Sequence, residues 1–264
     1  MSRRSGNRSG PAVLGTAGGG LGDASGWAAN ENVARMGQAG EVRMAAILDP
    51  LARPGGVTVL HDLRIPIPGF TANIDHVVVS GRTVLLIDSK MWKPGFYWTV
   101  GGKTRRGWRR FVVTSRSGKP AYPAETKTMS MAYDTITRYL HGRGINANIT
   151  RPVVVVFSSS QRTRLTVWML QFPGARAMTG DAFRRRARGL VGKRGADPVI
   201  VAALAELLNN GGSTSRRPDR RPPAQVPHEA DPFATARPAV SAPRGGTSPS
   251  SYETGGGAPL DPWA

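Results

Sequence analysis

The stretch from Asn73 to Lys90 constrains the fold of this chain more than any other. It contains two short runs rich in apolar and β-branched residues, Asn73–Ser80 and Thr83–Lys90, separated by Gly81 and Arg82. Two such runs around a two-residue break that contains glycine are typical of an antiparallel β-hairpin. We therefore expect the folded domain to form around a sheet that contains this hairpin.

Three charged residues interrupt the apolar strands of this hairpin: Asp75, Asp88 and Lys90. Asp88 and Lys90 are two residues apart, so they point to the same face of a strand. Asp75 lies near the start of the first strand and Asp88 near the end of the second, and these two ends are neighbours in a hairpin. Carboxylates held close together repel each other unless a cation lies between them. Oxygen ligands suit Mg²⁺ or Mn²⁺, so the pattern predicts a divalent metal site.

An aspartate followed after a spacer by Asp-x-Lys resembles the catalytic core of the PD-(D/E)xK nuclease superfamily. Three motifs in order are similar to those of the nuclease-related domain (NERD) family: Gly40-Glu41, Asn73-Ile74-Asp75-His76 and Asp88-Ser89-Lys90. The resemblance covers about residues 35–160. It implies an α/β fold with a restriction-endonuclease-like αβββαβ core, in which helices flank a mixed central sheet. It also implies a hydrolase that cleaves DNA with Mg²⁺ or Mn²⁺, in DNA processing, repair or mobile-element biology.

The same resemblance assigns roles to five residues. Glu41, Asp75, Asp88 and Lys90 are the implied catalytic set. Asp75 and Asp88 bind the ion directly, Ser89 adds its main-chain carbonyl, and Glu41 binds directly or through water. Lys90 orients or helps to deprotonate the attacking water and stabilises developing negative charge.

Each of these residues also has a plain structural interpretation. Glu41 can be a solvated side chain on a helix, Asp75 a residue that starts a strand, and Asp88 with Lys90 a simple ion pair. His76 faces away from Asp75 in a regular strand, so we expect it to be a half-buried structural residue. Asn73 shares the face of Asp75 and can touch the site.

Charge favours a nucleic acid as partner, most of all DNA. The formal net charge is +19, and residues 29–210 carry 27 basic and 11 acidic side chains, so the excess lies on the folded part. Basic globular surfaces attract polyanions, although a mutational bias toward arginine would leave the same composition. The segment around the glycines at 101, 102 and 107 interleaves basic groups with an aromatic ring, as phosphate contacts and base stacking require. The expected nucleic-acid contacts are Lys103, Arg105, Arg106, Trp108, Arg109 and Arg110; an ordinary solvated loop is the alternative.

Composition divides the chain into three segments. We expect a disordered Gly/Ser/Arg-rich arm over residues 1–28, the nuclease-like domain over 29–210, and a disordered tail rich in Pro, Gly, Ser and Arg over 211–264. The expected helices are about Asn30–Leu51, Pro123–His141, Asp181–Leu190 and Asp197–Leu208. Besides the hairpin, the expected strands are Val57–Leu63, Val153–Phe157 and Thr166–Leu170, and a second hairpin is expected from Phe96–Val100 and Arg109–Thr114 around a loop at residues 101–107.

Composition also excludes several classes of protein. The chain has no cysteine, so disulfides, zinc–thiolate sites and thiol nucleophiles are excluded. We find no signal peptide and no apolar run of bilayer length, and we expect a cytoplasmic protein that does not bind membranes. Many nucleases of this superfamily are homodimers, so a homodimer is possible, but the sequence contains no recognisable dimer motif. The protein partners of the tails are unknown. A nucleic-acid-binding module without useful activity, or an accessory interaction protein, stay open as alternatives.

Overall fold

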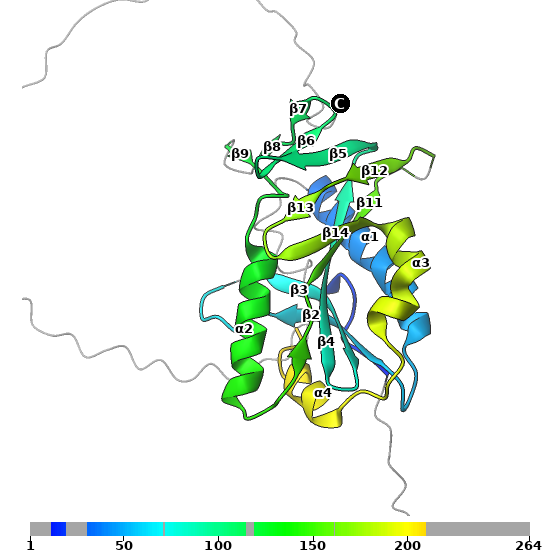
Figure 1. Ribbon diagram of the computed structural model, residues 1–264, viewed down its shortest axis with the longest axis vertical. Coiled ribbons are helices and arrows are strands. Elements are labelled where there is room, and N and C mark those ends of the chain that lie inside the picture. Colours follow the sequence, from blue (N-terminus) through cyan, green and yellow to red (C-terminus); the bar gives the residue numbers. More distant parts are fainter. Residues whose placement is uncertain (1–11, 20–30, 71, 115–118, 161, 210–264) are drawn as a thin grey trace, which may run out of the picture. The chain divides into compact units, whose positions relative to one another are not determined.

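A mixed β-sheet forms the centre of the protein in the computed structural model, which describes residues 12–19, 31–70, 72–114, 119–160 and 162–209 (Figure 1). The hairpin strands pair antiparallel with each other, whereas the strand after them runs parallel to the second hairpin strand. The α/β class with a mixed central sheet is therefore confirmed. Its strands are, in order across the sheet, β1 (Val13–Leu14), β2 (Thr58–Arg64), β3 (Asn73–Ser80), β4 (Thr83–Trp92), β11 (Val153–Ser158), β14 (Ala175–Thr179) and β13 (Gln171–Phe172), with β10 (Asn148–Ile149) paired to β4.

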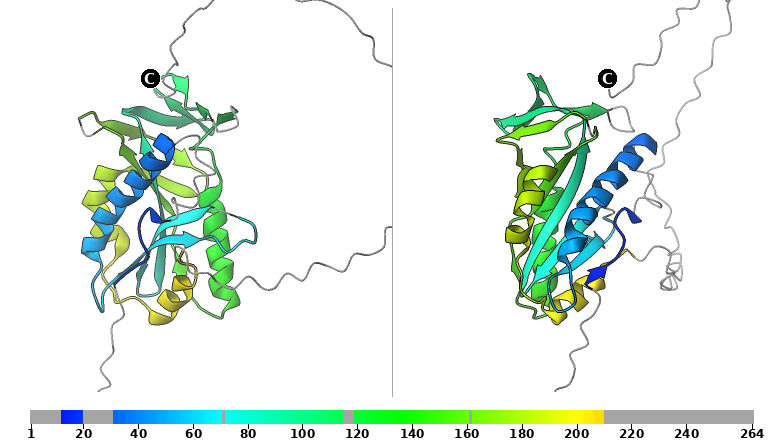
Figure 2. Two further views of the ribbon diagram at one scale, coloured as in Figure 1. Left: turned by 180° about the vertical axis from the view of Figure 1, so that it is seen from behind. Right: turned by 90° about the vertical axis from the view of Figure 1, so that its right-hand side faces the viewer.

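Helices cover both faces of this sheet, as Figures 1 and 2 show. Alternate residues of β4 divide between two apolar clusters, because successive side chains of a strand point to opposite faces. Leu85 and Ile87 pack with residues of α1 (Glu31–Leu48) and α3 (Gly180–Val191). Val84 and Leu86 pack with residues of α2 (Thr128–Gly142) and α4 (Pro198–Ala205). The flanking helices are therefore confirmed as part of the core.

The helix ends follow local chemistry. α1 ends at Leu48 rather than Leu51, where a 3₁₀ turn with Pro50 begins (Asp49–Leu51). α2 begins five residues later than Pro123. At α4 the expected N-cap is confirmed, because the side chain of Asp197 accepts a hydrogen bond from the Val199 N–H at 2.9 Å.

A second, four-stranded sheet follows β4 in the chain. It contains β5 (Gly95–Val100), β6 (Lys103–Arg106), β7 (Arg109–Arg110) and β12 (Leu165–Trp168). Our expectation of one hairpin around a loop at 101–107 is wrong, because β6 lies inside that segment and pairs with both β5 and β7. The end of the expected second strand instead forms β8 (Val113–Thr114), which pairs with β9 (Pro120–Ala121). β12 pairs parallel with β5 and so belongs to this second sheet.

Aromatic packing attaches the second sheet to the central one. The ring of Trp92, at the end of β4, lies 4.8 Å from Tyr97 of β5 and 4.6 Å from Phe111, measured between centroids. Phe172 of β13 stacks on the same indole at 5.9 Å. Tyr97 is fully buried and its hydroxyl donates to the Lys93 carbonyl. Two residues beyond Lys90, the chain is therefore anchored in a rigid aromatic core.

The N-terminal segment contributes to the sheet where we expected a disordered arm. Val13 and Leu14 pair with Val59 and Leu60 of β2, so that expectation is wrong for residues 12–19. Two apolar residues in a glycine-rich stretch are enough to add a short strand to an open sheet edge. The rest of the arm and the tail from 211 to 264 lie outside the described residues. Within the described part of the chain, no helix is both long and apolar enough to cross a lipid bilayer.

Candidate active site

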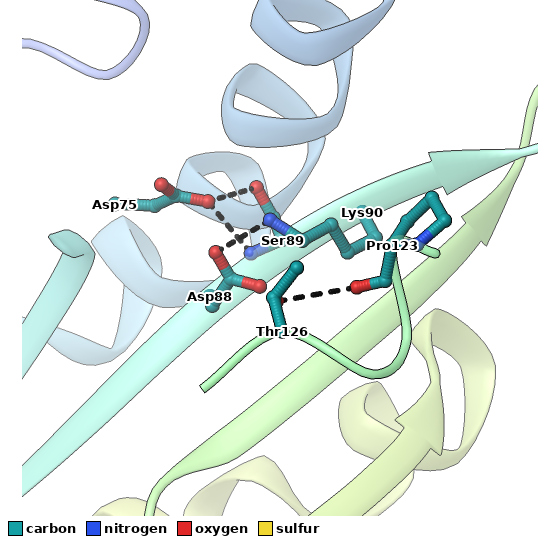
Figure 3. Close-up of polar contacts among 6 residues, drawn as sticks. All are labelled: Asp75, Asp88, Ser89, Lys90, Pro123 and Thr126. Carbon is teal, nitrogen blue, oxygen red and sulfur yellow. Dashed lines mark hydrogen bonds and ion pairs between the residues drawn. The ribbon is translucent and has the colours of Figure 1, made fainter. Parts of the chain in front are cut away.

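The site forms where β3 and β4 part. Their ladder ends at His76 opposite Ile87, so the next two residues along the strands are Asp75 and Asp88. There the main-chain N–H of Ser89 donates to Asp75 Oδ2 at 2.7 Å, and the Ser89 hydroxyl donates to the same oxygen at 2.9 Å (Figure 3). Beyond the last backbone pair, the Asp75 carboxylate therefore accepts the hydrogen bond of β4 in place of a main-chain carbonyl. The structure brings Asp75 to the neighbourhood of Asp88, as the hairpin pattern predicted.

A distortion of β2 accompanies this opening. The β2–β3 register passes from His61–His76 directly to Leu63–Ile74, and Asp62 between them has a left-handed φ of 57°. Few residues other than glycine adopt this conformation, and where they do it often marks a functional site. Asn73 donates to Asp62 Oδ1 at 2.8 Å. Asn73, which shares the face of Asp75, therefore holds the distorted strand next to the site.

Asp88 and Lys90 lie on one face of β4, as predicted, and form an ion pair of 2.8 Å between Oδ1 and Nζ (Figure 3). Asp88 is buried and Lys90 is half-buried. Burial by itself lowers the pKa of the Lys90 ammonium, but the charges of Asp88 and Asp75 outweigh burial and raise that pKa above its ordinary value. Lys90 is therefore a cation at neutral pH.

Glu41 reaches the site from α1 and is half-buried. Burial, followed by repulsion from Asp75, raises the pKa of Glu41 to about 8. Burial, followed by repulsion from Asp88, raises the pKa of Asp75 to about 7. Charges of one sign have thus been placed close together with too little solvent to screen them. The solvated interpretation of Glu41 does not describe this environment.

One contact at Glu41 was missed by sequence reasoning. The main-chain N–H of Gly18 donates to Glu41 Oε2 at 2.8 Å. Gly18 has a left-handed φ of 76°, which glycine adopts without strain. The only signal for this contact in the sequence is the apolar pair Val13-Leu14, which we had assigned to a disordered arm.

The donor atoms fit a hard divalent cation. They are carboxylate oxygens, and the raised pKa values of Glu41 and Asp75 show a repulsion that a cation would relieve. Among the described residues, no three His, Cys, Asp or Glu side chains are grouped as the ligands of one ion. Mg²⁺ does not require such a cage, because it usually keeps several waters and takes one or two protein carboxylates. Asp75 and Asp88, with water, satisfy that requirement.

His76 lies away from the carboxylates, as expected, but it is fully buried rather than half-buried. Its Nδ1 lies 2.7 Å from Nδ1 of His61, whose Nε2 lies 2.9 Å from Asp49 Oδ1. Burial, and then the proximity of His61, lower the pKa of His76 well below its ordinary value. A neutral histidine in this network is structural, which agrees with our interpretation of His76.

The six predicted nucleic-acid contacts all lie on or beside the second sheet, but they differ in their bonding. Arg106 donates to the Pro94 carbonyl, and Arg110 forms an ion pair with Glu125 at 2.9 Å while stacking over Tyr122. These two side chains help to hold the sheet in place. Lys103, Trp108 and Arg109 are exposed, and Arg105 lies beside an indole ring. Contact with nucleic acid stays a prediction for all six.

Comparison with known proteins adds one match. Residues 36–157 match the family model described as the nuclease-related domain. This range begins in α1, ends in β11 and includes Glu41, Asp75, Asp88, Ser89 and Lys90. No curated protein and no solved structure matches the chain.

Proposed function

Residues 36–157 belong to the nuclease-related domain family, and from this premise we propose that the protein hydrolyses phosphodiester bonds of DNA with Mg²⁺ or Mn²⁺. One observation carries the proposal. Where β3 and β4 part, Asp75 and Asp88 lie on neighbouring strands, Lys90 is bound to Asp88, and the charge of Asp75 acts on Glu41 of α1. Three acids can hold a divalent ion and a fixed ammonium can stabilise charge on a phosphate, which together support metal-dependent phosphodiester hydrolysis.

The residues divide this chemistry among themselves. Asp75 and Asp88 would hold the cation, with the main-chain carbonyl of Ser89 as a further donor and Glu41 acting directly or through water. A divalent ion supplies a water of lowered pKa and neutralises charge on a phosphoryl oxygen. The hydrogen bonds from Ser89 orient the Asp75 carboxylate, and the Gly18 N–H orients that of Glu41.

Lys90 acts by its charge. Its ammonium is held by Asp88 and keeps its proton, so it can donate a hydrogen bond to an oxygen of the scissile phosphate. Negative charge grows on that phosphate as the water attacks, and a fixed cation stabilises it without reorganisation. This role is electrostatic, and it requires no proton transfer from Lys90.

A second candidate function is a nucleic-acid-binding module that keeps the fold without useful activity. The observation that favours it is the self-contained bonding of the site. Asp75 Oδ2 already accepts two hydrogen bonds from Ser89, and Lys90 is already paired with Asp88. In such a module these bonds would simply hold the diverging strands together.

Cleavage of labelled DNA decides between the two. Linear, circular and single-stranded substrates are incubated with the purified full chain and Mg²⁺, Mn²⁺ or EDTA. We expect cleavage with either metal and none with EDTA. Asp88→Ala and Lys90→Ala should each lower the cleavage rate at least about a hundredfold, since Asp88 would hold the ion and Lys90 would stabilise the charge that develops on the phosphate.

Asp134→Asn is the matched control, because it removes an exposed carboxylate of α2. It should cleave at the wild-type rate. Equal rates for all four proteins would point to a contaminating nuclease. No cleavage under any condition, with DNA binding unchanged in the site variants, would support the binding module instead.

A further inference from the structure

The second sheet presents aromatic rings on its outer face. Along β5, Tyr97 points inward and is fully buried, so Phe96 and Trp98 point outward. Trp168 of β12 lies opposite Trp98 in the register and shares that face. Phe96 is 44% exposed, Trp168 55% and Trp108 86%. Gathered exposed rings of this size mark an interaction surface rather than a fold requirement.

These rings form one assembly around Trp98, which we call the aromatic face: Phe96, Trp98, Trp108 and Trp168. The Trp98 centroid lies 6.3 Å from that of Trp108 and 6.3 Å from that of Trp168. The indole N–H of Trp98 donates to the Gly107 carbonyl at 2.7 Å, and Arg105 donates to the Trp108 carbonyl at 2.8 Å. The turn that carries Trp108 is therefore fixed in place, and a ligand would meet a preorganised surface.

Positive charge accompanies the rings. Arg105 pairs with Trp98 across β5 and β6, and its guanidinium carbon lies 5.8 Å from the Trp98 centroid. Lys103 pairs with Val100 on the same face and is exposed. Residues 95–110 and 165–168, which contain all four strands, include no Asp or Glu. An aromatic surface with cations and no acids is complementary to a polyanion that has exposed ring faces.

We propose that the aromatic face binds unpaired nucleotides of single-stranded DNA, with bases stacked on Trp108 and Trp168 and phosphates near Lys103 and Arg105. Stacking needs bases whose flat faces are free, which a base-paired duplex does not offer. Stacking also does not depend on the base sequence, because every base has such a face. The substrate would therefore be a single strand or the unpaired end of a duplex.

The consequence for cleavage rests on the proposed function. Lys90 and Trp98, the central ring of the aromatic face, are eight positions apart in the chain, and a chain of that length spans at most about 29 Å. At the stacked spacing of about 3.4 Å per nucleotide, a strand of about nine nucleotides covers this distance. One bound strand can thus reach from the aromatic face to the carboxylates, and Figure 1 shows the second sheet at the C-terminal end of β4.

Oligonucleotide binding tests the inference without cleavage. Fluorescence anisotropy is measured in EDTA with the full chain and a labelled oligo-dT of about 15 nucleotides, and then with a duplex of equal length. The double variant Trp108→Ala/Trp168→Ala should weaken single-strand binding by at least about thirtyfold, because each of the two lost base–aromatic stacks is worth at least about fivefold. Duplex binding should change by less than about twofold.

Two further variants make the result specific. Trp108→Phe/Trp168→Phe keeps the rings and should restore single-strand binding to within about threefold of wild type. Arg188→Ala removes an exposed charge on α3 and should weaken the binding of single-stranded and duplex DNA to the same extent. Since Trp108 and Trp168 are exposed, the thermal unfolding midpoint of the double variant should match that of wild type.

The outcomes separate this inference from the proposed function. If the alanine variant binds single strand and duplex as wild type does, or loses both equally, the aromatic face is not a stacking site, whatever the cleavage assay shows. If its loss is selective while metal-dependent cleavage is absent, the stacking site stands and the proposed hydrolysis fails.

Discussion

The acidic residues of the site are buried close together and repel one another. Asp75 has an ordinary pKa of 3.8, and burial with the neighbouring Asp88 raises it to about 7. Between these two values the unfolded chain releases its proton while the folded chain retains it. The free energy of unfolding in the absence of metal therefore falls as pH rises through this window. The cation of the proposed function would relieve this stability cost at neutral pH.

Asp75→Asn should remove that cost. In EDTA at pH 8, we expect the variant to be more stable than wild type by about 1–3 kcal/mol, because no charge has to be buried. At pH 4 the wild-type carboxyl is largely protonated in the folded state, and the two proteins should have nearly equal stability. Urea unfolding at the two pH values measures the difference.

The control for this experiment is Asp134→Asn, which changes an exposed carboxylate of α2. Its difference from wild type should not depend on pH. Excess Mg²⁺ should then raise the stability of wild type at pH 8 by mass action and leave Asp75→Asn almost unchanged. An Asp75→Asn protein that is less stable than wild type at both pH values would contradict this account.

At the scale of elements, the position of Glu41 depends on how closely α1 approaches β4. Gly40 is buried, and a β-carbon added there would lie 3.7 Å from the Met91 β-carbon, the Met91 nitrogen and the Ser89 hydroxyl. That is ordinary van der Waals contact, so one methyl group fits and a larger side chain does not. The two elements therefore meet with the site residues immediately beside the contact.

Gly40→Ala and Gly40→Leu should consequently change the stability of the protein in opposite directions. The alanine variant should be more stable by about 0.5–1 kcal/mol, because alanine favours a helix interior and its methyl group has space. The leucine variant has to push α1 away from β4, and it should lose both stability and most of the cleavage activity. Thermal unfolding and the DNA cleavage assay measure the two effects. A leucine variant with wild-type cleavage would show that the site does not depend on this packing.

At the scale of the whole molecule, positive charge is spread over several exposed surfaces. Besides the second sheet, α3 carries Arg184, Arg185, Arg186 and Arg188, all exposed. Together with a net charge of +19, this distribution favours binding to the DNA backbone in general. In the proposed function, charge would govern how tightly any DNA is held, whereas the aromatic face would select the form of the DNA.

Salt dependence separates these two contributions. Duplex affinity should fall steeply between 50 and 200 mM salt, by about a thousandfold if at least six phosphates are contacted, because bound counterions are released. The double variant Trp108→Ala/Trp168→Ala should keep the same slope of log affinity against log salt, since stacking carries no charge. The triple variant Arg184→Ala/Arg185→Ala/Arg188→Ala should have a shallower slope. A slope that is equally shallow in all three proteins would contradict an electrostatic interface.

Local patterns predicted the parts of this protein that depend on neighbouring residues. The alternation around Gly81 and Arg82 predicted the β3–β4 hairpin, and the spacing of Asp88 and Lys90 predicted their shared face. Asp197 before a proline predicted the start of α4. These features follow from backbone geometry within a few residues, so they can be read without knowledge of the rest of the chain.

Contacts between distant segments could not be read in that way. The strand β6 was hidden in a glycine-rich basic segment, because its pairing with β5 and β7 decides its conformation more than its own residues do. Gly18 reaches Glu41 across 23 positions, and its surroundings resemble a flexible arm. Likewise, the pairing of Trp168 with Trp98 requires β12 to add to β5 from far along the chain.

The sequence by itself determined that Asp75, Asp88 and Lys90 come together, since strand periodicity and a short turn are local properties. Only the tertiary structure decided their electrostatic state and their surroundings. The parting of β3 from β4 gives Asp75 the hydrogen bonds of Ser89, and the approach of α1 buries Glu41 beside it. The physical reason is that burial and repulsion depend on distances through space, which the order of residues along the chain does not specify.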